Sequence, residues 1–170
     1  LEEAGWRFGV VVSPAEEIHE AGIPLAELCE RNARAKAAAV AALRPEAVVL
    51  GADTLVWIDG EPLGKPRDLG GVRAMLRRLS GRTHTVCTGV CVIAGGHGEC
   101  FHELTEVVFH ELDEAAIGRY FERIDPLDKA GAYAVQEHGE MVVAEVRGDY
   151  PNVVGLPLGR VTEVLRKWLD

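Results

Sequence analysis

The strongest candidate for chemistry is an acidic residue inside an apolar stretch. Asp53 lies between two apolar runs, residues 47–50 and 55–58. An ionised carboxylate in a buried strand is costly unless a cation, a metal or a hydrogen-bond donor compensates it, so we expect such a group opposite Asp53. The small residues 51–52 leave room for a bulky ligand to approach the backbone. The alternative is a strand-end aspartate that forms an Asx turn with Thr54.

Two lysines are candidates for binding an anion. Lys36 falls on the otherwise apolar stripe of a helix predicted over residues 24–43, together with Asn32. Lys36 either snorkels past the edge of the core or points its ammonium into a cleft. Lys65 lies on a loop where it either contacts a phosphate or is a solvated turn lysine. The spacing of its glycines and the proline that follows it exclude a Walker phosphate loop.

Two glutamates that follow the apolar residues 6–12 could join Asp53 around a metal ion. Glu16 and Glu17 lie in an acidic loop, and oxygen ligands suit Mg²⁺ or Mn²⁺. The alternative is a solvated surface pair. Two segments rich in small or uncharged residues, 128–133 and 149–157, either let a ligand approach the backbone closely or are ordinary loops over a sheet end.

Hydrophobic spacing predicts the elements that must position these residues. We expect strands at residues 6–12, 47–50, 55–58, 85–94, 103–112 and 141–146. We expect helices at residues 24–43, 69–79, 113–124 and 161–168, with Asp68 and Asp113 as N-terminal caps. Helices alternate with single strands early in the chain and with a hairpin in the middle, which predicts an α/β fold with a mixed sheet.

Length and charge exclude several classes of protein. The 170 residues fit a single domain, and 27 acidic against 18 basic residues give a net charge of −9. That field repels nucleic acids and anionic lipids, and no apolar run reaches the roughly 18 residues of a membrane span. We expect a cytoplasmic protein that binds neither nucleic acid nor membranes. The four cysteines form no Cys-x-x-Cys pair, so we expect reduced core thiols.

The candidate segments together resemble a known family. They are Gly51-Ala52-Asp53-Thr54, Gly64-Lys65-Pro66, residues 79–81 with His84 and Thr88-Gly89, Asp128-Lys129-Ala130-Gly131-Ala132-Tyr133, and residues 152–157. In this order, over essentially the whole chain, they resemble the Maf family of nucleoside triphosphate pyrophosphatases. The resemblance implies a twisted mixed sheet flanked by helices, two lobes with a central cleft, and a homodimer. It also implies hydrolysis of a nucleoside triphosphate to the monophosphate and pyrophosphate with a divalent cation, Mg²⁺ or Mn²⁺.

The same resemblance suggests roles for individual residues. Asp53 corresponds to the family's catalytic acidic residue, a general base, and with Glu17 it would hold the metal. Lys36 and Lys65 match positions around the phosphates. The last two matches, at positions linked with the choice of substrate, are Thr54 and Gln136.

These matches favour the branch of the family that acts on dTTP and UTP. Two alternatives remain open: a pyrophosphatase of the 7-methyl-GTP type, and a nucleotide-binding regulator of cell division tied to septum formation.

One expectation concerns the start of the chain. The family pattern opens with a strand and a loop rich in serine and arginine, whereas this sequence starts at Leu1 with what reads as the end of a helix closed by Gly5. We therefore expect residues 1–170 to be a single Maf-like domain that is truncated at its N-terminus. A polypeptide that truly begins at Leu1 is expected to hydrolyse its substrate weakly or not at all.

Overall fold

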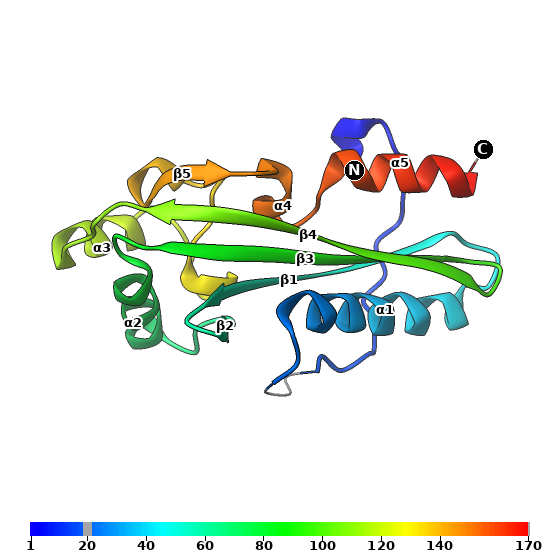
Figure 1. Ribbon diagram of the computed structural model, residues 1–170, viewed down its shortest axis with the longest axis horizontal. Helices are drawn as coiled ribbons and strands as arrows, with labels where there is room; N and C mark the ends of the chain where they lie inside the picture. Colours follow the sequence, from blue (N-terminus) through cyan, green and yellow to red (C-terminus); the bar gives the residue numbers. More distant parts are fainter. Residues whose placement is uncertain (19–21, 170) are drawn as a thin grey trace. The chain divides into compact units, whose positions relative to one another are not determined.

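The computed structural model describes residues 1–18 and 22–169 (Figure 1). Its elements in chain order are η1 (Glu2–Ala4), α1 (Leu25–Leu43), β1 (Val49–Ile58), β2 (Glu61–Leu63), α2 (Leu69–Leu79), β3 (Thr83–Ala94), β4 (His97–Phe109), α3 (Glu114–Phe121), η2 (Ala130–Ala132), η3 (Gly139–Met141), β5 (Val143–Arg147), α4 (Tyr150–Val154) and α5 (Leu158–Leu169). The predicted helices are confirmed, although α3 ends earlier than expected. The predicted caps are also confirmed, because the carboxylates of Asp68 and Asp113 accept hydrogen bonds from the amides of Gly71 and Ala116, each at 2.7 Å.

The strands form one sheet in the order β2-β1-β3-β4-β5. The α/β class with flanking helices is confirmed, but the sheet is antiparallel rather than mixed. The reason lies in the β1–β2 hairpin, which reverses the chain before α2 begins. Helix α2 therefore joins two strands, β2 and β3, that run the same way but are separated by β1.

Strand β2 was not predicted, and β4 begins at His97 rather than at residue 103 and ends at Phe109. Two further strand predictions differ from the structure. The first is that the strands predicted at residues 47–50 and 55–58 are one continuous strand, β1, which begins only at Val49 and runs through Asp53 without a break. The second is that residues 6–12 form no strand, and Val10 and Val12 are 85% and 90% exposed. β-Branched residues favour a strand only where they pack against a neighbour on a sheet, and this segment pairs with none of the described strands. The predicted loop at 15–22 is irregular over 15–18, and residues 19–21 lie outside the described residues.

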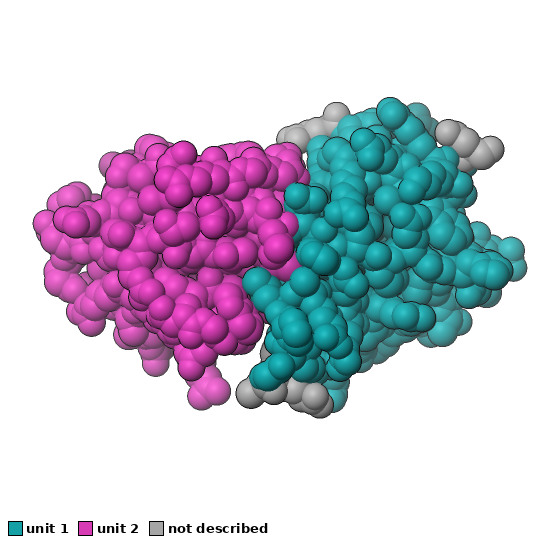
Figure 2. Space-filling model, in the orientation of Figure 1, with its two compact units in different colours: residues 1–54, 88–103, 155–170 teal, residues 55–87, 104–154 magenta. Residues whose placement is uncertain are grey.

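The chain divides into two compact units, coloured separately in Figure 2. Unit 1 comprises residues 1–54, 88–103 and 155–170, and unit 2 comprises residues 55–87 and 104–154. Strands β1, β3 and β4 contribute residues to both. Two compact units agree with the expected two lobes, and the cleft expected with them stays a prediction. No helix within residues 1–18 and 22–169 is both long and apolar enough to cross a membrane.

In unit 1, two helices cover the two faces of the strands (Figure 1). One hydrophobic cluster joins α1 to alternate residues of β1 and β3: Ala33, Ala37, Val40, Val49 and Cys91. A second cluster joins α5 to residues of the opposite parity on β3 and to β4: Val90, Val92, Phe101, Val161, Val164 and Leu165. Successive side chains of a strand point to opposite faces, so residue parity decides which helix each strand residue meets.

Two glycines bring the backbone of α1 directly onto its face of the sheet. A Cβ atom added to Gly51 would lie 2.5 Å from the carbonyl oxygen of Ala33 and 2.7 Å from the amide nitrogen of Ala37. A Cβ atom added to Gly89 would lie 2.3 Å from the carbonyl group of Cys29. These separations are shorter than real Cβ contacts, so a larger residue at either position must push the helix away from the strands.

The cysteines differ from the prediction of four reduced thiols. Cys91 and Cys100 form a disulfide that joins β3 to β4. The prediction is therefore wrong for this pair. The spacing of these two cysteines matches no known motif, and the hairpin of β3 and β4 places them opposite each other. Cys29 and Cys87 are buried, as expected of core residues.

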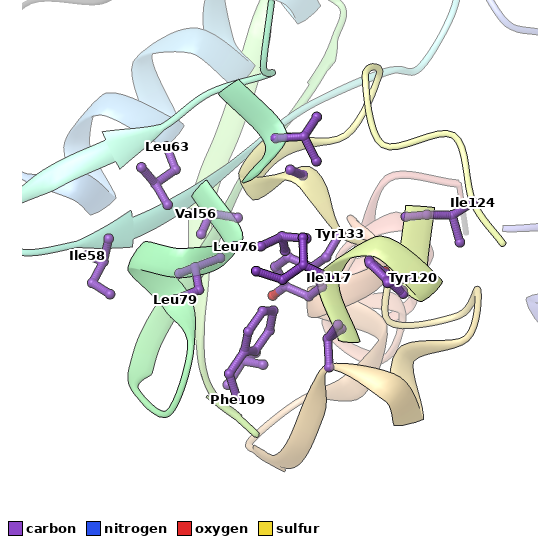
Figure 3. Close-up of a cluster of buried hydrophobic side chains, with 14 of the residues drawn as sticks. Val56, Ile58, Leu63, Leu76, Leu79, Phe109, Ile117, Tyr120, Ile124 and Tyr133 are labelled. Atoms are coloured by element: carbon purple, nitrogen blue, oxygen red, sulfur yellow. The ribbon is translucent and has the colours of Figure 1, made fainter. Parts of the chain in front are cut away.

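The core of unit 2 gathers side chains from its strands and from α2 and α3 (Figure 3). Its members include Val56, Ile58, Leu63, Leu76, Leu79, Phe109, Ile117, Tyr120, Ile124 and Tyr133. Gly64 and Gly131 tie two further segments to this core, because the amide of Gly131 donates to the carbonyl of Gly64 at 3.1 Å. The motif segments 64–66 and 128–133 therefore lie side by side.

A buried histidine sits beside this core. His84 is 2% exposed, and its Nε2 lies 2.8 Å from the hydroxyl of Tyr133. The rings of His84, Tyr133 and Phe109 meet edge to face, with centroids 4.9 to 5.4 Å apart. Burial lowers the pKa of His84 to about 4 and raises the pKa of Tyr133, so both groups are neutral at pH 7.

We predict that Gly51→Ala destabilises the protein by several kcal/mol, because the added methyl group collides with the backbone of α1. Urea unfolding monitored by circular dichroism measures this loss. Gly118→Ala is the matched control: it adds the same methyl group to α3, where no atom lies within 4 Å. The control is expected to gain about 0.5 to 1 kcal/mol from helix propensity. Equal effects of the two substitutions would contradict a packing role for Gly51.

We predict that His84 makes stability depend on pH between about 6.5 and 4. The unfolded chain binds a proton near pH 6.5 and the folded chain only near 4, so stability is full above 6.5 and falls as the pH drops through this window. The full loss is about 3 kcal/mol. Comparing wild type with His84→Gln by urea unfolding at pH 7 and pH 4.5 isolates this contribution, because other groups cancel.

The stability advantage of wild type over His84→Gln should narrow at the lower pH. Tyr133→Phe is the control, since it removes the hydrogen bond but keeps His84 buried and should keep the wild-type pH dependence. A constant difference between wild type and His84→Gln would contradict the assignment.

Candidate functional site

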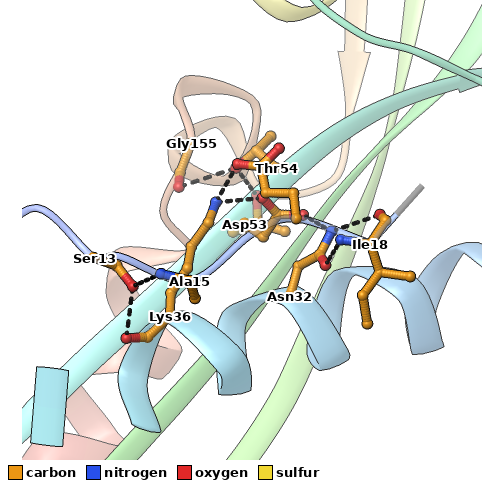
Figure 4. Close-up of polar contacts among 10 residues, drawn as sticks. Ser13, Ala15, Ile18, Asn32, Lys36, Asp53, Thr54 and Gly155 are labelled. Atoms are coloured by element: carbon orange, nitrogen blue, oxygen red, sulfur yellow. Dashed lines mark hydrogen bonds and ion pairs between the residues drawn. The ribbon is translucent and has the colours of Figure 1, made fainter. Parts of the chain in front are cut away.

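Asp53 lies on the face of β1 that meets α1. It shares the parity of Val49 and Gly51 and is 6% exposed. Its two carboxylate oxygens have different partners: Lys36 Nζ is 2.6 Å from Oδ1, and Asn32 Nδ2 donates to Oδ2 at 3.0 Å. Figure 4 shows both side chains reaching Asp53 from the helix. We expected a cation, a metal or a hydrogen-bond donor opposite Asp53, and the structure places there a cation and an amide donor instead of the alternative Asx turn.

Lys36 is held between two carboxylates. Its Nζ lies 2.6 Å from Asp53 Oδ1 and 2.7 Å from Glu17 Oε1, and its side chain is 25% exposed. Burial by itself would lower the pKa of Lys36, but hydrogen bonds to Asp53 and Glu17 and the charges of both outweigh burial, so the pKa is raised. Lys36 is therefore an ammonium at neutral pH. It points into a polar site instead of snorkelling to solvent.

Asn32 connects the segment that carries Glu17 to the rest of the site. Its Oδ1 accepts from the amide of Ile18 at 2.7 Å, and its Nδ2 donates to the carbonyl of Ile18 at 3.3 Å as well as to Asp53. Asn32 is 1% exposed, so its amide makes all of these hydrogen bonds in the protein interior. The sequence offered one signal for this role: Asn32 lies one helical turn before Lys36 in the same apolar stripe.

Ser13 connects residues 13–18 to the backbone of Lys36. The hydroxyl of Ser13 donates to the backbone carbonyl of Lys36 and accepts from the amide of Ala15, both at 3.2 Å (Figure 4). Residues 13–18 have no regular structure of their own. Hydrogen bonds to side chains therefore replace the missing ladder and fix the position of Glu17.

Thr54 points to the opposite side of β1 from Asp53, because the two are consecutive on a strand. Its hydroxyl lies 2.9 Å from that of Thr88 and donates to the carbonyl of Gly155 at 3.3 Å. The structure thus brings together three motif segments that are far apart in the sequence, 51–54, 88–89 and 152–157. The role of Thr54 in the choice of substrate stays a prediction.

Lys65 and Gln136 belong to unit 2. Both are exposed. Lys65 follows Gly64, whose carbonyl is bound by Gly131, so its loop is anchored to the 128–133 segment. Their predicted contacts with phosphates and with the base stay predictions.

The carboxylates fit a divalent cation. Glu17 and Asp53 already converge on one cation, the Lys36 ammonium, and oxygen donors suit Mg²⁺ or Mn²⁺. Within the described residues there is no group of three or more acidic, histidine or cysteine side chains that could hold a metal. A metal here would take two protein carboxylates and complete its shell with substrate phosphates, which is the usual arrangement for Mg²⁺.

Known proteins resemble this chain over nearly its whole length. The family model described as Maf-like protein matches residues 1–168. A dTTP/UTP pyrophosphatase of Akkermansia muciniphila is 51% identical over 165 residues, which cover 97% of this chain and 87% of the relative. Relatives of the same name in Symbiobacterium thermophilum and Bacillus pumilus are 45% and 44% identical, covering 99% and 97% of this chain and 87% of each relative. The chain belongs to the Maf family.

Proposed function

We propose that this chain is a nucleoside triphosphate pyrophosphatase that hydrolyses dTTP and UTP to the monophosphate and pyrophosphate. The observation that carries the proposal is the convergence of Glu17 and Asp53 on the Lys36 ammonium. An acidic base beside a fixed cation suits attack on a polyanionic phosphate chain. Relatives up to 51% identical over nearly the full chain carry the name dTTP/UTP pyrophosphatase.

The proposed reaction uses water as the nucleophile. The water oxygen forms a bond to phosphorus, the bond between the α and β phosphates breaks, and pyrophosphate leaves. Asp53 orients the water and accepts its proton. Lys36 and Asn32 hold the two carboxylate oxygens, and each oxygen keeps a further lone pair with which to accept from the water.

Lys36 has a second proposed task. Its ammonium carries three donors, so it can contact a phosphate oxygen while it remains paired with a carboxylate. Such a fixed cation stabilises the charge that develops on the leaving pyrophosphate without reorganisation. Lys65 is exposed and is proposed to contact the same phosphate chain.

Glu17 and Asp53 would hold the divalent cation, which when bound neutralises charge on the phosphates. The chain's own contribution is to keep both carboxylates convergent. Lys36 does this between them, and Asn32 does it by fixing the backbone next to Glu17.

Gln136 and Thr54 are proposed to select the base. A carboxamide donates and accepts at once, which is what the edge of a pyrimidine requires. The exposure of Gln136 is consistent with a group that meets a ligand rather than the core. For the whole protein we propose a homodimer in the cytoplasm, supported by the family resemblance and by a net charge of −9 that disfavours nucleic acid and anionic membranes.

We predict that Asp53→Asn lowers kcat/KM for UTP by about 10² to 10⁴, because the amide keeps the shape of the side chain but cannot accept a proton. Pyrophosphate release with micromolar enzyme measures turnover, and calorimetry with a non-hydrolysable UTP analogue measures binding, which should persist. Glu99→Gln is the matched control, because Glu99 pairs with Lys167 at 3.3 Å on the surface of the same unit. Turnover in Asp53→Asn equal to that of wild type would refute the proposed base.

We predict that UTP and dTTP are preferred over GTP and 7-methyl-GTP, and that EDTA stops hydrolysis until Mg²⁺ or Mn²⁺ is restored. Gln136→Ala should lower the preference for UTP over GTP about tenfold, the value of one or two hydrogen bonds. A substrate panel scored by pyrophosphate release tests these expectations. A preference for 7-methyl-GTP would contradict the pyrimidine assignment, and binding of UTP without any turnover would favour the nucleotide-binding regulator.

A further inference from the structure

The backbone on both sides of Gln136 is fixed by side chains from other elements. The hydroxyl of Tyr120, on α3, accepts from the amide of Ala134 at 3.1 Å and donates to its carbonyl at 3.4 Å. The hydroxyl of Tyr150, on α4, donates to the carbonyl of Val135 at 3.2 Å. The segment has no regular structure at this point, so these bonds take the place of a helix or a ladder.

An ion pair fixes the other side. Lys129 Nζ lies 3.1 Å from Glu137 Oε1 and 3.3 Å from Asp128 Oδ1, with the Lys129 side chain 21% exposed. Burial by itself would lower the pKa of Lys129, but hydrogen bonds to Glu137 and Asp128 and their charges raise it, so Lys129 is an ammonium at neutral pH. Glu137 follows Gln136 directly.

The side chain of Gln136, unlike the residues around it, has no partner among the described residues. Its side chain is exposed and makes no hydrogen bond within the described part of the chain. Residues before and after it are tied to Tyr120, Tyr150 and Lys129, and only the carboxamide is left available. The buried hydroxyl of Tyr120 pairs with both backbone groups of one residue, Ala134, and so holds the segment two residues before Gln136 in place.

Tyr120 is suited to this task because it is fully buried and stays protonated. Burial raises its pKa to about 12, and the charges of Glu137 and Glu140 act in the same direction. A neutral hydroxyl can donate and accept at the same time, as the two groups of Ala134 require. Neighbouring Ile117 lies in the core of unit 2, so α3 is a rigid support.

We propose that Tyr120, Tyr150 and Lys129 are positioning residues that hold the backbone at Gln136 in one place for recognition of the nucleotide base. The inference rests on the proposed function, in which Gln136 reads a pyrimidine. A side chain whose backbone is fixed before binding has fewer conformations to lose when the base arrives, so its hydrogen bonds contribute more to affinity. The three residues act through Gln136 and do not contact the substrate.

The test uses Tyr150→Phe and Lys129→Met, since both side chains are at least partly exposed and their loss should leave the protein folded. Each variant is expected to lower the preference for UTP over GTP about 3- to 10-fold, through weaker binding of a non-hydrolysable UTP analogue. Tyr120, Tyr150 and Lys129 are called the frame below. Binding of inorganic tripolyphosphate should not change, because the frame affects only recognition of the base. Lys129→Arg should restore the preference.

Combination with Gln136→Ala shows whether the frame works through the amide. In that background Tyr150→Phe and Lys129→Met should have no further effect on the preference for UTP. Lys167→Met removes a comparable surface ion pair, with Glu99, and should leave the preference unchanged. Thermal unfolding of each variant verifies that the fold is intact.

Two results separate failure of the inference from failure of the proposed function. If Gln136→Ala lowers the preference for UTP but Tyr150→Phe and Lys129→Met do not, or if their effects persist in full without Gln136, the frame has no positioning role. If Gln136→Ala itself leaves the preference unchanged, the proposed reading of the base is wrong, and the inference is overturned with it.

Discussion

The site depends on how closely the backbone of α1 lies on the sheet. Gly51 and Gly89 leave no Cβ atom between the strands and the helix, so the peptide groups of α1 meet the sheet directly. Asn32 and Lys36 therefore stand beside Asp53 at hydrogen-bond distance. An alanine in place of either glycine would move the helix outward and part these contacts before any polar residue changed.

Burying the three polar side chains of Asp53, Lys36 and Asn32 in this packing costs free energy of folding. Taking a carboxylate and an ammonium out of water loses their solvation, and an apolar pair of similar volume is often as stable or more so. Lys36 and Asn32 satisfy both carboxylate oxygens of Asp53, and Lys36 keeps its charge because it faces two carboxylates. This arrangement keeps a base and a cation side by side. Packing of the core does not require such a pair, whereas chemistry on a phosphate does.

Sequence patterns predicted what depends on neighbours along the chain. The periodicity of α2 and α3, their caps Asp68 and Asp113, and the misfit of Asp53 and Lys36 in apolar surroundings are all local signals. What they missed depends on pairing over long distances. Residues 6–12 have the composition of a strand but no partner strand, and the Cys91–Cys100 disulfide follows from the hairpin register. The antiparallel sheet likewise follows from the place of β1 between two strands of equal direction.

Two buried polar residues whose hydrogen bonds the sequence could not reveal, Asn32 and Tyr120, share one physical principle. Asn32 pairs with both the amide and the carbonyl of Ile18, next to Glu17, and Tyr120 pairs with both groups of Ala134, close to Gln136. In each case a buried polar side chain on a helix anchored in the core replaces the backbone partners that an irregular segment lacks. Such a segment would otherwise be mobile, because its peptide groups have no ladder. The reactive or recognising side chain can then occupy an irregular, accessible segment and still be held in place by the rigid core.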